Sequence, residues 1–166
     1  MKRFAKSILG AALAALLSTA PLMGQTQTAT IQATATVMQP INVVGAVNLA
    51  FGSVFPGVAR TVAVNAAGAG RFDITGQASA PVFVSFVLPA NLTSGANNLP
   101  IGTWTGHRNT VNNPTTGTNF TPSAALTAAT FSATGQLFTF IGATVTPATN
   151  QAAGVYNGTI QITVTY

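Results

Sequence analysis

The sequence has 166 residues, only 4% of them charged, with six basic side chains, one acidic side chain and no cysteine. This composition excludes disulfide bridges, thiolate metal sites and catalysis by a thiol or by paired carboxylates. At this length the chain is about one domain, which packing and backbone pairing must stabilise without disulfides.

The first 24 residues have the pattern of a cleavable signal peptide. Three basic residues precede an Ala- and Leu-rich run over residues 8–17 that is too short to span a bilayer. We place cleavage after Gly24, with Ala20 as the alternative. The chain is then exported by the general secretory route, with a mature domain over residues 25–166 and no membrane span. Without the three basic residues the formal net charge falls from +5 to +2. No basic stripe remains for nucleic-acid binding.

Residues 25–38 contain the first predicted strand, because residues 28–37 alternate strictly between two kinds of side chain. One face carries Ala29, Ile31, Ala33, Ala35 and Val37. The other face carries only threonine and glutamine. The apolar face is mostly small, which suits a strand inserted into a narrow groove.

Further strands are predicted between turn signals along the rest of the chain. Their ranges are 41–44, 48–54, 58–65, 71–76, 81–89, 125–131 and 136–146. The segment 81–89 is apolar on both faces and predicts a central strand. Residues 90–122 are rich in Asn, Thr, Gly and Pro and predict loops with one short strand at 101–105.

The last predicted strand alternates up to Tyr166. The face expected to be buried carries Ile160, Ile162, Val164 and Tyr166, and the turn before this strand contains Gly154. The edge of such a strand is able to accept another strand as a partner. Many short strands and no helical periodicity predict an all-β, immunoglobulin-like antiparallel β-sandwich.

An ordered set of segments resembles the DUF4402 family of bacterial secreted proteins. The segments cover residues 33–37, 40–41, 49–52, 72–76, 137–145, 154–158 and 162–166. The family's function is undefined, so this resemblance implies an exported β-domain and no particular chemistry.

The chain is also similar, more weakly, to pilus subunits assembled by donor-strand complementation. In those subunits an alternating N-terminal strand fills a groove of the next subunit, and the terminal strand carries a Gly and a Tyr at the spacing of Gly154 and Tyr166. The pilin cysteine pair is absent here. This resemblance implies a pilin-like sandwich, self-assembly and a periplasmic assembly chaperone as a partner.

Residues with catalytic or metal-binding chemistry are scarce. Asp73 is the only carboxylate side chain and lies two residues from Arg71, which favours a surface ion pair over a catalytic role. Trp104, His107 and Arg108 form one cluster that could bind a ligand from a loop, or Trp104 caps the core while the other two are solvated. We expect no catalytic residues, no metal site and no cofactor.

The sequence therefore supports two functional hypotheses. The first is a non-catalytic structural subunit of an extracellular or cell-surface fibre, in which residues 29–37 of one copy pair with the terminal strand of another. Pairing of the same residues within their own chain would produce the same alternation. The second hypothesis is a monomeric secreted or surface-attached adhesin that recognises a glycan or protein through residues 90–122.

Overall fold

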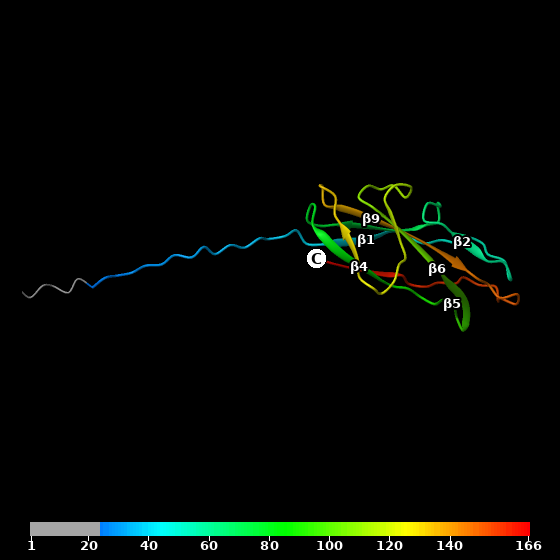
Figure 1. Ribbon diagram of the computed structural model, residues 1–166. Helices are drawn as coiled ribbons and strands as arrows, with labels where there is room; N and C mark the ends of the chain where they lie inside the picture. The colour runs from blue at the N-terminus through cyan, green and yellow to red at the C-terminus, as the bar shows by residue number, and fades with distance from the viewer. Residues whose placement is uncertain (1–23) are drawn as a thin grey trace, which may run out of the picture. The chain divides into compact units, whose positions relative to one another are not determined.

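The computed structural model describes residues 24–166 (Figure 1). Residues 37–166 form one compact unit, and the described residues before it, 24–36, belong to a second unit. Residues 1–23 of the predicted signal peptide lie outside the described residues. Among residues 24–166, no helix is long and apolar enough to cross a membrane.

Two antiparallel sheets make up the compact unit. The main path of the larger sheet runs β1 (Asn42–Val47), β3 (Gly70–Thr75), β9 (Gln136–Val145), β6 (Asn97–Asn109) and β5 (Asn91–Ser94). Two short strands lie off this path: β2 (Arg60–Val62) pairs with β9, and β7 (Thr118–Phe120) pairs with β6. The smaller sheet has the order β10 (Gln161–Thr165), β4 (Pro81–Val87) and β8 (Thr127–Thr130).

The strand order is that of an immunoglobulin-like sandwich. In such sandwiches one sheet has the order A-B-E-D and the other contains C, F and G. Strands β1, β3, β9 and β6 correspond to A, B, E and D, while β4 and β10 correspond to C and F. The fold class predicted from the sequence is therefore confirmed.

The main core lies between the two sheets, where each strand contributes alternate side chains. On β4, Val82, Val84 and Phe86 are buried and meet Ile74 of β3 and Ile141 of β9. Because β4 pairs on both sides, its prediction as a central strand is confirmed.

A second, smaller core cluster lies on the larger sheet. Its buried members are Leu99, Ile101, Ala143 and Val145, from β6 and β9. Irregular segments cover this part of the sheet. The side chains that pack against it belong to no strand: they are Leu49, Phe51, Val54 and Tyr156. This end of the sheet lacks the second regular layer that a complete sandwich would provide.

The structure differs from the sequence prediction in three regions. Residues 48–54, predicted as a strand, form none, because Gly52 adopts a φ of 66° that breaks the extended backbone. Residues 90–122, predicted mainly as loops, contain β5, β6 and β7. Residues 28–37, predicted as the first strand, are assigned to no strand. The other predicted strands are present with shifted ends, and the segment predicted at 58–65 is reduced to β2.

Candidate functional site

Strand β10 has one edge without a strand partner in the compact unit. It pairs with β4 from Gln161 opposite Val87 to Thr165 opposite Phe83, and no strand of residues 37–166 pairs with its other edge. In an immunoglobulin-like sandwich, strand G lies beside F at this position. The free edge exposes backbone N–H and C=O groups that another strand could pair with.

The inward face of the β10 segment contributes to the core, as the sequence predicted. Ile160, Ile162 and Val164 are half-buried and pack against the main core cluster. A strand added at the free edge would extend this apolar face. Ile160, Ile162 and Val164, three of the predicted acceptor residues, thus lie on or next to a strand with an unpaired edge.

Tyr166 connects three segments that are distant in sequence. Its hydroxyl accepts a hydrogen bond of 2.8 Å from the backbone N–H of Gln77 and donates one to the backbone carbonyl of Gln39. The backbone N–H of Gln39 donates in turn to the side-chain oxygen of Gln77 at 3.2 Å. The Tyr166 ring also meets Phe131 edge-on, with centroids 6.4 Å apart. Tyr166, just after the end of β10, is therefore fixed to Gln39 in the segment that precedes β1.

These contacts define a seam, which we take as the space between the edge strands β1 and β10. At one end, Tyr166 and Gln39 close it. At the other end it widens into a groove of about 1000 Å³, between the segment that follows β1 and the segment that precedes β10. Its lining includes Val47, Leu49, Phe51, Leu92, Val145, Gly154, Tyr156 and Ile160.

The walls of the groove are held by backbone hydrogen bonds to β5 and to the turn between β2 and β3. Asn157 exchanges two backbone hydrogen bonds with Thr93 of β5, at 2.8 and 2.9 Å. On the opposite wall, the backbone N–H of Ala50 donates to the carbonyl of Gly68 at 2.8 Å. None of the lining residues is charged. The groove is a neutral site lined by both apolar and polar side chains, and backbone hydrogen bonds fix its walls.

Residues 24–40 are assigned to no strand, and every side chain among them is exposed. The two largest apolar residues of the predicted donor face, Ile31 and Val37, are 95% and 93% exposed. Their apolar face is thus not buried in the described part of the chain. The partner of this segment stays a prediction.

The predicted cluster of Trp104, His107 and Arg108 does not form a single binding site. Trp104 is half-buried against both core clusters, as its core-capping interpretation required. His107 and Arg108 are neighbours on β6, so their side chains point to opposite faces of the sheet. The expectation that His107 is solvated is wrong, since it is 5% exposed.

His107 instead anchors the loop between β6 and β7. Its ring nitrogens each lie 2.7 Å from an oxygen, one of the Asn119 side chain and one of the Thr116 backbone. The side-chain amide of Asn109 also donates to Thr116. On the other face of the sheet, the guanidinium carbon of Arg108 lies 5.9 Å from the centre of the Phe120 ring. Both residues therefore have structural contacts that account for their positions.

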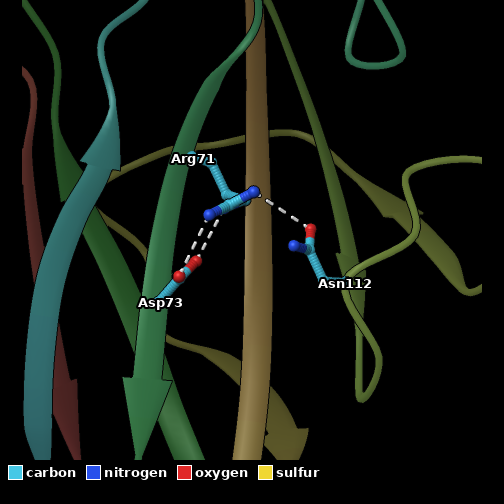
Figure 2. Close-up of polar contacts among 3 residues, drawn as sticks. All are labelled: Arg71, Asp73 and Asn112. Carbon is cyan, nitrogen blue, oxygen red and sulfur yellow. Dashed lines mark hydrogen bonds and ion pairs between the residues drawn. The ribbon is translucent and has the colours of Figure 1, made fainter.

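Arg71 and Asp73 form the predicted ion pair on β3 (Figure 2). The Arg71 guanidinium donates to both carboxylate oxygens of Asp73, at 2.7 and 3.2 Å, and to the side-chain oxygen of Asn112 at 3.2 Å. Asn112 lies in the loop that His107 anchors. The sequence does not predict this connection, because no local pattern joins residues that are 41 positions apart.

Comparison with known families identifies one match. The model of a family described as "Domain of unknown function (DUF4402)" matches residues 41–166, which include every strand of the compact unit. No curated protein matches the chain.

Proposed function

The chain belongs to the DUF4402 family, and from that premise we propose that it is a non-catalytic structural subunit of a bacterial extracellular or cell-surface fibre. Residues 29–37 of one copy pair with the free edge of β10 in another copy. Each subunit thereby completes the sandwich of its neighbour. The observation that carries this proposal is the unpaired edge of β10 beside an uncharged groove.

Backbone pairing supplies the attraction, because an added strand satisfies the N–H and C=O groups of the free edge. Side-chain burial adds to it. Moving Ile31 or Val37 from water into the seam would contribute about 1.5–3 kcal/mol for each side chain that becomes fully buried. The small side chains of Ala33 and Ala35 let the added backbone lie close to its neighbours.

Charge also supports self-association. Residues 25–38 contain no charged side chain, and the groove lining contains none. Strand addition at this site therefore desolvates no ion, which would otherwise cost several kcal/mol. The partner that fits this site is a second copy of the chain. A periplasmic chaperone that protects the free edge before assembly would also have to place an uncharged segment there.

Electron microscopy of the mature chain from Gln25 tests the proposal, with one matched pair of variants. We expect filaments from the unaltered chain and monomers from Ala33→Asp, because the variant places a charge on the face that the neighbour buries. Thr34→Asp adds the same charge on the opposite face and should still form filaments. Circular dichroism establishes that both variants are folded.

Deletion of residues 25–37 gives a second readout. The assembled chain should unfold at a higher temperature than the deletion variant, because binding of a neighbour's strand stabilises the folded state. A deletion variant that is a stable monomer with the same unfolding temperature as the full mature chain would contradict the proposal. So would a mature chain that stays monomeric at every concentration.

The adhesin hypothesis predicts the monomeric outcome. Residues 90–122 supply three strands of the described fold, and the predicted ligand-binding residues are used in internal contacts. These observations favour the structural subunit. Monodisperse particles of the mature chain that bind a glycan surface would favour the adhesin instead.

A further inference from the structure

A second cleft, of about 440 Å³, lies on the side of the sandwich away from the seam. One wall is β8, the edge strand of the smaller sheet, and the other contains the paired ends of β6 and β7. We call it the β8 cleft. It shares no lining residue with the groove beside β10. The proposed strand pairing therefore leaves this cleft unused.

Arg108 points into the space between the two sheets. On β6, Gly106 lies two residues earlier and is covered by the ring of Phe120, which packs against the main core. Because side chains alternate along a strand, Arg108 is on this inner face too. The register places Thr118 of β7 and Thr139 of β9 directly on either side of it. A row of three polar side chains therefore faces the smaller sheet.

The opposite wall leaves room in front of this row. Strand β8 consists of two alanines between two threonines, so it carries no large side chain. Ala128 and Ala129 both line the cleft. The cleft therefore exists because a long charged side chain on one wall faces only small side chains on the other.

The guanidinium of Arg108 has no anionic partner within residues 24–166. It lies over the Phe120 ring, and this cation–π contact leaves its N–H donors unbonded. All hydrogen bonds that arginine side chains donate within these residues come from Arg71, which is paired with Asp73, the only acidic side chain of the sequence. No buried side-chain nitrogen of these residues lacks a partner, so the unbonded donors of Arg108 are accessible from outside.

We propose that the β8 cleft binds a hexuronic acid unit of an acidic polysaccharide, with the sugar carboxylate on Arg108. A guanidinium can donate two parallel hydrogen bonds to a carboxylate. A second copy of this chain offers no such group, because its Asp73 is bonded to its own Arg71. The site differs from the cluster predicted by the sequence, since it joins Arg108 to β7 and β8 instead of to Trp104 and His107.

The rest of the lining fits the other parts of a sugar. Thr110, Thr118 and Thr130 supply hydroxyl groups that make no hydrogen bond within residues 24–166, and Pro81 supplies an exposed apolar surface. Small-molecule sites have volumes of about 300–1,000 Å³ and combine apolar surface with a few polar groups. Arg108 is the single charged residue of the lining, which suits the single negative charge of a carboxylate. A phosphate dianion would leave one charge without a partner.

Titration calorimetry of the mature chain from Gln25 tests the site with a short oligomer of galacturonic acid and an uncharged galactose oligomer of the same length. We expect the uncharged oligomer to bind about tenfold to hundredfold more weakly, the range of a hydrogen bond to a charged group. Arg108→Gln should weaken binding of the acidic oligomer by a similar factor. Arg60→Gln removes a charge on β2, outside the cleft, and should leave binding unchanged. Circular dichroism establishes that both variants are folded.

Two results would overturn the site: equal binding of the two oligomers, or equal weakening by the two variants. Inorganic sulfate that binds as tightly as the galacturonic acid oligomer would overturn the sugar as the ligand, since the threonines and Pro81 would then add nothing to binding.

A second measurement needs no change at Arg108 and does not depend on assembly. Nuclear magnetic resonance titration of Ala33→Asp, which should stay monomeric whether or not the unaltered chain forms filaments, should shift the amide signals of Arg108 and Thr118. The signals of Val47 and Ile160 in the groove should stay in place. Shifts at the groove alone, or no shifts, would overturn the β8 cleft as the site, whatever electron microscopy of the mature chain shows about fibres.

Discussion

At the scale of single residues, side chains far apart in sequence hold the ends of the fold together. The Tyr166 hydroxyl joins Gln39 and Gln77, and His107 anchors the loop that also meets Arg71 through Asn112. None of these contacts follows from local sequence. Each depends on which strands the fold places side by side.

The change Tyr166→Phe tests the contribution of the hydroxyl while keeping the aromatic ring on Phe131. Two hydrogen bonds to backbone groups are lost, each with a net value of about 0.5–1.5 kcal/mol. Because Tyr166 is 42% exposed, hydrogen bonds from water to the freed backbone groups offset part of this loss. We expect the free energy of unfolding to fall by about 1–2 kcal/mol in urea titration of a non-assembling variant such as Ala33→Asp. An unchanged value would mean that the hydroxyl does not close the seam in solution.

At the scale of elements, strand β6 explains why residues 90–122 were predicted mainly as loops although they contain three strands. Between Gly102 and Thr105 its pairing with β9 shifts at a bulge, where Thr103 has a φ of 46°. Leu99 and Ile101 are buried before the bulge, whereas Trp104, within the bulge, packs against both core clusters. The bulge changes the alternation by one residue, so the period-2 signal is lost within a true strand.

Strand β9 is the element on which the larger sheet depends, because it pairs with β2, β3 and β6. Its Ile141 is 0% exposed. Ile141→Ala should lower the free energy of unfolding by about 2–5 kcal/mol, through lost burial and the cavity that remains. Val155→Ala, at a position that is 78% exposed, removes apolar atoms outside the core and serves as the control. Equal effects of the two changes in urea titration would contradict the described core.

At the scale of the whole molecule, the fold is stabilised almost entirely without charge. After the predicted signal peptide the chain retains one acidic and three basic side chains. In the described residues the ion pair of Arg71 and Asp73 is partly exposed, at 24% and 32% for the two side chains. Exposed pairs of this kind contribute little to stability.

We therefore expect stability to be nearly independent of ionic strength. Raising sodium chloride from about 0.1 M to about 1 M shortens the screening length from about 10 Å to about 3 Å. The free energy of unfolding should change by less than about 1 kcal/mol, since residues 24–166 contain one ion pair to screen. Urea titration of Ala33→Asp at the two salt concentrations measures this. A larger loss in high salt would show that the pair, together with Asn112, stabilises more than its exposure indicates.

The sequence by itself determined the fold class, the central position of β4, the Arg71–Asp73 pair and the inward face of β10. Each of these follows from a local pattern: alternation, an apolar run between prolines, or two charges on one face of a strand. Only the tertiary structure decided the bulge in β6, the anchoring role of His107, the groove beside β10 and the closure of the seam by Tyr166. These features depend on contacts between residues far apart in sequence, and the period-2 pattern of a strand does not specify which strand lies beside it.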